Sequence, residues 1–219
     1  ILLGSPDVRV TGYGETVRLE HWQSAMDTIR AHPGVMAAAP FVLTAAKVTN
    51  AAGYVQGVQV QGIPGNAPAD QLVTDIRSRA ISGDFSFAAP DGSHRGIVLG
   101  ELLAARLLAP VRDSVTLVSP AGIRVENFLS GMLAQMETFT VTGIFRTEMY
   151  EYDHSYEYID LEPARRLAGL GQDVTGIEVR TADRSDATRV AKELESLLGF
   201  PRRTEDWSTT NASLFRALQ

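Results

Sequence analysis

Residues 139–161, with the sequence FTVTGIFRTEMYEYDHSYEYIDL, decide the fold of this chain. From Phe139 to Phe145 apolar and polar residues alternate and β-branched side chains are frequent, which predicts a strand with one buried face. Residues 156–161 predict a second strand, and the acidic and aromatic residues 151–153 between them predict a change of chain direction. Because the sequence before this stretch is mostly β and the sequence after it is typical of a βαβ unit, we expect the stretch to mark the crossing between two lobes.

Upstream of this stretch the sequence predicts a strand, a helix and a long hairpin. Residues 7–11 alternate in polarity, and residues 18–32 carry apolar side chains at the i, i+3, i+4 and i+7 positions of an amphipathic helix. Residues 35–49 and 54–63 are β-rich runs separated by a short turn, so we expect them to pair as a hairpin. The proline- and glycine-rich residues 64–68 predict a boundary between lobes.

The rest of the chain alternates predicted strands and helices. We expect strands at residues 96–100, 113–118, 174–181 and 202–207, and helices at residues 101–108, 163–170 and 183–198. This order predicts an α+β fold with two lobes. An α/β lobe built from both chain ends, residues 1–66 and 147–219, would be interrupted by a β-rich lobe at residues 67–146.

Composition and charge limit the function. The chain has 219 residues, a net charge of −6 and a pI near 5.2, so we expect neither nucleic acid nor an anionic membrane surface as its main partner. It has no cysteine, which excludes thiolate catalysis and cysteine-based metal sites. No stretch reaches the roughly 18 apolar residues that cross a bilayer. Because the sequence begins and ends abruptly, we expect an excised soluble domain of a larger protein.

The sequence contains no recognisable catalytic motif. The four histidines lack metal-ligand spacing, and the sequence has neither a complete phosphate-binding loop nor a nucleophile elbow. One alternative is a hydrolase centred on Asp153 and His154, because a carboxylate beside an imidazole can serve as a general base. The interpretation that we favour is a non-enzymatic domain without cofactor or metal.

Residues 121–136, AGIRVENFLSGMLAQM, form a long apolar excursion between two predicted strands, and we call them the arm segment. The arm segment is either a loop that covers the core or a projecting arm that binds a partner. Methionine and phenylalanine suit an adaptable apolar contact surface. The candidate partner-binding residues are Val125, Asn127, Phe128, Leu129, Met132, Leu133 and Met136.

Several short segments carry a resemblance to a known family. They are residues 1–4 (ILLG), 35–40 (VMAAAP), 57–63 (GVQVQGI), 96–100 (GIVLG), 102–107 (LLAARL), 139–145 (FTVTGIF), 151–153 (EYD) and the pattern DW…N…LF…AL over residues 206–218. Together they resemble the periplasmic domain of LolC/LolE-type permeases, the lipoprotein-releasing subunits of an ABC transporter, within the MacB-like periplasmic core domains. This resemblance implies a periplasmic domain between two transmembrane helices of a bacterial inner-membrane protein.

The resemblance also implies an architecture and a set of partners. The lobe of both chain ends would be Porter-like, and the inserted lobe would be Sabre-like and carry the arm segment. In this family a hairpin from the same place captures the periplasmic lipoprotein chaperone, so the implied partners are that chaperone or the lipoprotein cargo. A separate cytoplasmic subunit would hydrolyse ATP, and the permease would form a homodimer or a heterodimer. A LolC-like and a LolE-like role both stay open, as does a macrolide-exporter-like or cell-division-like permease that binds another periplasmic protein.

Overall fold

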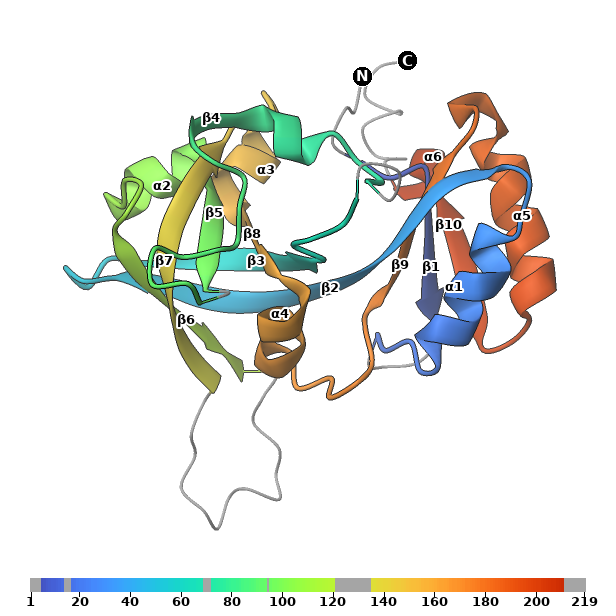
Figure 1. Ribbon diagram of the computed structural model, residues 1–219, viewed down its shortest axis with the longest axis horizontal. Coiled ribbons are helices and arrows are strands. Elements are labelled where there is room, and N and C mark those ends of the chain that lie inside the picture. The colour runs from blue at the N-terminus through green and yellow to red at the C-terminus, as the bar shows by residue number, and fades with distance from the viewer. Residues whose placement is uncertain (1–4, 14–16, 69–71, 94, 121–134, 211–219) are drawn as a thin grey trace, which may run out of the picture. The chain divides into compact units, whose positions relative to one another are not determined.

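The computed structural model describes residues 5–13, 17–68, 72–93, 95–120 and 135–210 (Figure 1). The chain forms two compact units. Unit 1 consists of Ile1–Phe41, Asn66–Thr74 and Asp173–Gln219, and unit 2 consists of Val42–Gly65 and Asp75–Gln172. Both units combine helices and strands, as the predicted α+β class requires.

Unit 1 contains an antiparallel sheet with the strand order β10-β1-β9-β2. The strands are β1 (Val8–Gly12), β2 (Val35–Asn50), β9 (Gly176–Thr181) and β10 (Arg202–Asp206). The predicted alternation in β1 is observed, because Val8, Val10 and Gly12 are buried whereas Arg9 and Thr11 between them are partly exposed. Since β1 pairs with both β9 and β10, the two ends of the sequence build one sheet.

Amphipathic helices complete unit 1. They are α1 (Trp22–Arg30) and α5 (Ala187–Leu198), followed by the short α6 (Trp207–Thr210). The helix α1 buries Ala25, Met26 and Ile29, and α5 buries Ala187, Val190, Ala191 and Leu194. Both helices were predicted from the helical spacing of these apolar residues. The predicted start of α5 is instead a 3-10 turn, η5 (Arg184–Asp186), in which the Asp183 side chain accepts a hydrogen bond from the Ser185 backbone.

Unit 2 is a closed ring of strands. Its strands are the second part of β2 with β3 (Val55–Ile63), β4 (Ala80–Gly83), β5 (Gly96–Gly100), β6 (Ser114–Ser119), β7 (Gln135–Phe145) and β8 (Tyr156–Asp160). The hydrogen-bonded path runs β2-β3-β8-β5-β7, and β6 closes it by pairing with both β7 and β2. Closure leaves the short β4, which pairs with β7, at an edge.

The predicted hairpin of residues 35–49 and 54–63 is confirmed by the antiparallel β2–β3 ladder. The compact units, however, differ from the predicted lobe boundaries. Strand β3 pairs in parallel with β8, and β8 pairs with β5, so residues 42–65 and 147–172 belong with unit 2. The whole stretch 139–161 therefore lies in unit 2, and β2 is the strand whose residues belong to both units.

Three short helices pack on the strands of unit 2. They are α2 (Glu101–Leu107), α3 (Tyr150–Ser155) and α4 (Leu161–Leu167). The helix α3 occupies the place where we expected only a change of direction. The helix α4 begins before the predicted residue 163, because the Asp160 side chain caps it by accepting from the Leu161 backbone N–H.

An aromatic cluster anchors the segment that precedes β4. Ile76, Phe87, Val98, Phe145 and Tyr158 are buried together, and the rings of Phe145 and Tyr158 lie 5.3 Å apart. The 3-10 helix η2 (Ile76–Arg79) supplies Arg77, whose guanidinium lies over the Phe85 ring and donates to the carbonyls of Pro64 and Gly65. The η2 turn leads directly into β4.

Candidate functional site

The structure places little of the arm segment. Val125, Asn127, Phe128, Leu129, Met132 and Leu133 lie outside the described residues, so their role in partner binding stays a prediction. Met136 is described: it lies in β7, pairs with Val118 of β6, and is 64% exposed. A solvent-exposed methionine at this position is available for contact with another molecule.

The ladder of β6 and β7 frames the arm segment. The two strands pair in register from Ser114↔Thr140 to Ser119↔Gln135, and the hydroxyls of Thr116 and Thr138 lie 3.1 Å apart. Because β6 also pairs with β2, this ladder belongs to the closed ring. The two ends of the segment between Ser119 and Gln135 are therefore fixed side by side on a hydrogen-bonded base.

An ion pair ties this base to α4. Arg166 donates through Nε and one terminal nitrogen to the two carboxylate oxygens of Glu137, at 3.0 and 3.3 Å. The hydrogen bonds that Arg166 donates to the Glu137 carboxylate raise the pKa of Arg166 above its usual value. The Glu137 side chain is only 12% exposed, so this two-point pair is better shielded from solvent than most surface pairs.

Asp153 and His154, the alternative catalytic pair, contact different partners and not each other among the described contacts. The buried Asp153 carboxylate accepts hydrogen bonds from the backbone N–H and hydroxyl of Thr147, both at 2.7 Å, and from the backbone N–H of Glu148 at 3.1 Å. His154 stacks on Tyr150 and contacts Arg106. The carboxylate therefore caps the loop before α3, and no described contact joins it to the imidazole.

Glu157 in β8 is a buried carboxyl group that the sequence did not single out. It lies between Val60 of β3 and Leu99 of β5 in the ladder, and neither carboxyl oxygen has a hydrogen-bond partner among the described residues. Burial raises the pKa of Glu157 well above its usual value. A protonated carboxyl is the form that such surroundings favour.

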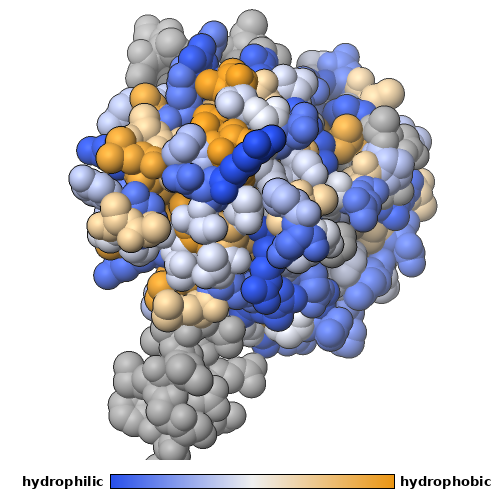
Figure 2. Space-filling view, turned by 60° about the vertical axis from the view of Figure 1, so that its left-hand side comes forward, coloured by the Kyte–Doolittle hydropathy of each residue, from blue (hydrophilic) through white to orange (hydrophobic). Residues whose placement is uncertain are grey.

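An apolar groove of about 470 Å³ lies beside α2 in unit 2. Its lining residues include Ile81 of β4, Ala104 and Ala105 of α2, and Ile144 of β7. At its rim Leu108 ends α2 in the left-handed conformation and is 63% exposed. Figure 2 brings this side of unit 2 forward and shows hydrophobic side chains exposed among polar ones. The groove adds a second apolar surface to the one expected from the arm segment.

The described residues form neither a metal-binding cluster nor a membrane-spanning helix. No group of three or more histidine or acidic side chains among them could hold a metal ion. No helix formed by those residues is long and apolar enough to span a bilayer.

Sequence comparison gives two informative relatives. The chain is 30% identical over 203 residues to the lipoprotein-releasing system transmembrane protein LolC of Neisseria meningitidis, covering 90% of this chain and 46% of the relative. It is 26% identical over 201 residues to the protein of the same name from Xylella fastidiosa, covering 92% of this chain and 46% of the relative. The chain thus spans about half the length of the curated relatives that it matches.

Solved structures show the same fold at low sequence identity. The extracellular domain of the noncanonic ABC-type transporter YknZ from Gram-positive bacteria aligns with a TM-score of 0.57 at 10% identity, over 91% of this chain and 99% of that one. The periplasmic region of MacB from Actinobacillus actinomycetemcomitans aligns with a TM-score of 0.56 at 12% identity, over 97% and 94%.

The model of the MacB-like periplasmic core domain matches residues 3–197, which is most of the chain. This match and the LolC relatives confirm the resemblance inferred from the short segments and the periplasmic location that it implied. The chain belongs to the family of MacB-like periplasmic core domains.

Proposed function

We propose that this chain is the non-catalytic periplasmic domain of an ABC-transporter permease that passes lipoproteins from the inner membrane to a periplasmic chaperone. The observation that carries the proposal is the similarity to two proteins named as lipoprotein-releasing transmembrane proteins, over 90% and 92% of this chain. In this proposal unit 1 is the Porter-like lobe and unit 2 the Sabre-like lobe. ATP is hydrolysed by a separate cytoplasmic subunit, and two permease subunits pair in the membrane.

The arm segment is the proposed contact with the chaperone or the lipoprotein. Two features support this assignment. Its candidate residues are apolar except for Asn127, and its flanking strands β6 and β7 belong to a closed ring that is tied to α4 through Glu137 and Arg166. A fixed base lowers the conformational entropy that a contact segment loses when it binds. Phe128, Leu129, Met132 and Leu133 would supply the buried contact area.

Site-specific photo-crosslinking in the intact permease tests this role. A photoreactive residue at position 128 is expected to crosslink to a periplasmic lipoprotein chaperone or to a triacylated lipoprotein in membranes supplied with periplasmic extract. The same residue at position 197, an exposed site on α5 in unit 1, is the matched control and is expected to give no such adduct. Adducts only with a drug-efflux adaptor or a cell-wall hydrolase regulator would overturn the proposal.

A double substitution gives an independent test. Phe128→Asp with Leu129→Asp places two charges on the proposed apolar contact, so binding of chaperone or lipoprotein is expected to be lost. The thermal unfolding midpoint of the chain reports whether the fold survives. Unchanged binding in the folded double variant would exclude the arm segment as the contact.

The second candidate is a permease that engages another periplasmic protein, as a macrolide-exporter-like or cell-division-like domain. The structural likeness to the periplasmic region of MacB, over 97% of this chain, is the observation that favours it. The identity of the crosslinked partner at position 128 distinguishes the two candidates, because the fold is common to both.

A further inference from the structure

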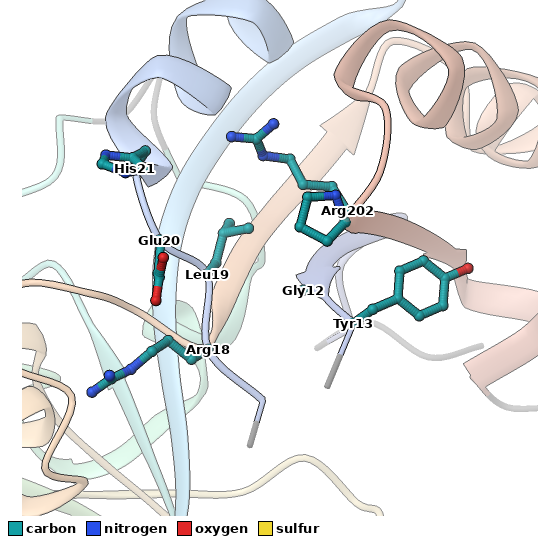
Figure 3. A pocket seen from close by; sticks show the side chains of 8 residues that line it. Gly12, Tyr13, Arg18, Leu19, Glu20, His21 and Arg202 are labelled. Carbon is teal, nitrogen blue, oxygen red and sulfur yellow. The ribbon is translucent and has the colours of Figure 1, made fainter. Parts of the chain in front are cut away.

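Unit 1 contains a pocket of about 390 Å³ that the proposed function does not use (Figure 3). Its lining residues come from the end of β1, from the segment before α1 and from the start of β10. They are Gly12, Tyr13, Arg18, Leu19, Glu20, His21, Pro201 and Arg202. A pocket of this size can receive one or two side chains of a bound peptide.

Close backbone packing creates the pocket. A Cβ atom at Gly12 would overlap the carbonyl oxygen of Arg18, so only glycine lets the chain fold back against β1 at this point. Leu19 is then held by a backbone hydrogen bond to Val174 and is 2% exposed, which gives the pocket an apolar floor. On the other side the Tyr13 N–H donates to the Pro201 carbonyl at 2.7 Å. Backbone hydrogen bonds therefore hold both walls of the pocket.

Arg202 provides the positive charge of the pocket. Its side chain is half-buried, and one terminal nitrogen donates to the Leu198 carbonyl at 3.2 Å. No carboxylate pairs with it among the described residues. Arg18, by contrast, pairs with Asp173 at 3.3 Å. In Figure 3 the Arg18 side chain points away from Tyr13, whereas the Arg202 side chain reaches toward the segment that carries Leu19.

An exposed aromatic pair borders the pocket. The rings of Tyr13 and Phe200 are stacked with their centroids 5.9 Å apart, and these side chains are 54% and 86% exposed. The guanidinium of Arg203 lies 5.8 Å from the centre of the Tyr13 ring. Aromatic and arginine side chains grouped in this way are the composition of binding hot spots.

We propose that this pocket binds an acidic peptide segment of a partner protein. A carboxylate of the segment pairs with the unused N–H donors of Arg202, and a neighbouring apolar side chain packs on the Tyr13–Phe200 stack. Charge complementarity within the pocket favours this occupant, because Arg202 has no carboxylate partner among the described residues and donates there only to a backbone carbonyl. Of the lining residues only Glu20 is acidic, and it is exposed. The inference concerns unit 1 and does not depend on the arm segment or its cargo.

Fluorescence anisotropy with defined peptides tests the proposal on the 219-residue chain. The probe is a fluorescein-labelled peptide in which phenylalanine alternates with aspartate and glutamate, and its counterpart carries asparagine and glutamine instead. The acidic peptide is expected to bind saturably, at least about tenfold more tightly than the neutral one. Added salt is expected to weaken the binding of the acidic peptide and to leave the binding of the neutral peptide unchanged.

Variants locate the binding. Arg202→Ala and Phe200→Ser are each expected to lower the affinity for the acidic peptide about tenfold. Arg202→Lys keeps the positive charge but loses the planar guanidinium, so it is expected to lower the affinity less. The matched controls remove the same groups elsewhere: Arg95→Ala removes an exposed arginine from unit 2, and Leu197→Ser removes an exposed apolar side chain from α5. Neither control is expected to change binding by more than about twofold.

Several results would overturn the proposal. They are the absence of saturable binding up to about 1 mM peptide, equal binding of the acidic and neutral peptides, and unchanged binding in both Arg202→Ala and Phe200→Ser. Binding to phosphatidylglycerol vesicles in place of the peptide would also overturn it, because the occupant would then be a lipid surface. Phe200→Ser keeps the test decisive if Arg202→Ala fails to fold, since Phe200 is 86% exposed.

Discussion

Gly62 of β3 lies so close to Ala164 of α4 that a Cβ atom on the glycine would overlap the Cβ atom of the alanine. This contact sets the distance between the helix and the ring of strands in unit 2. Gly62→Ala is therefore expected to lower the free energy of unfolding by about 2 kcal/mol or more, because helix or strand must shift. Urea denaturation measures the change.

The same strand supplies the matched control for that experiment. A Cβ atom at Gly57, also in β3, meets no atom within 4 Å. Gly57→Ala is expected to change stability by less than about 1 kcal/mol, and to raise it if the lost chain entropy dominates. Equal destabilisation by the two substitutions would show that strand propensity, and not the contact with α4, determines the effect.

Asp153 is expected to be a stability residue. Asp153→Ala removes an acceptor from the Thr147 backbone N–H, the Thr147 hydroxyl and the Glu148 N–H in a buried place. The free energy of unfolding is expected to fall by about 3 kcal/mol as a result. Glu148 has a φ of 65°, and losing the hydrogen bond that holds it in this strained conformation adds to the loss. The neighbouring substitution His154→Ala is expected to cost less than about 1 kcal/mol. A larger loss from His154→Ala would contradict this division of roles.

Asp206 is expected to make the chain acid-sensitive. Burial would raise the pKa of this carboxyl, but hydrogen bonds from Thr188, Thr209 and Ser208 together outweigh it and lower the pKa to about 2. Because the folded-state pKa lies below the unfolded-state value of 3.8, the associated stability is present above pH 3.8 and lost as the pH falls toward 2. It amounts to about 2 kcal/mol at neutral pH.

Unfolding measured from pH 2 to pH 6 checks this expectation. Asp206→Asn cannot ionise, so its stability should depend less on pH over this range than that of the unaltered chain. An identical pH dependence in both proteins would mean that other carboxylates account for the acid sensitivity.

Glu157 is expected to have the opposite pH dependence. Burial raises its pKa in the folded chain, so the folded state keeps a proton that the unfolded chain has already released. Its contribution to stability is therefore fully present below the ordinary carboxyl pKa of 4.5 and is lost as the pH rises toward the folded-state value. The loss has a limiting slope of about 1.4 kcal/mol per pH unit.

The substitution Glu157→Gln tests the expected pH dependence. Glu157→Gln removes the ionisable group at nearly constant volume and should become more stable than the unaltered chain as the pH rises above about 5. Thermal unfolding at several pH values measures the difference. A variant that is less stable at every pH would indicate that the carboxylate is charged and paired in the folded chain.

The sequence correctly predicted those helices and strands that are recognisable from residues close together in the chain. The helices α1 and α5 show helical spacing of apolar residues over two or more turns, and the β2–β3 hairpin has two long β-rich runs around a short turn. Strand partners that are distant in the sequence leave no such signal. The parallel pairing of β3 with β8 and the closure by β6 depend on which strands meet in three dimensions, so the lobe boundaries differed from the compact units.

The same limit applies to the sites. The arm segment could be proposed from the sequence because its apolar residues lie within one short stretch, and its role stays a prediction. The unit 1 pocket could not, because β1 brings Gly12 opposite Arg202 from the other end of the chain. Asp153 gave a misleading signal, since its neighbour in the sequence is a histidine but its partners in space are Thr147 and Glu148.

The closed ring of unit 2 should allow the segment between Ser119 and Gln135 to be replaced without loss of the fold, because the ring closes through strands outside that segment. The ladder that holds both of its ends is completed by β2, β6 and β7 through contacts that the segment does not supply. Under the proposed function, a related domain would change its partner by replacing this segment, while the strands of the closed ring keep their pairing. For protein engineering, a foreign loop can be inserted between Ser119 and Gln135, because the pairing of β6 with β7 holds both insertion points in register.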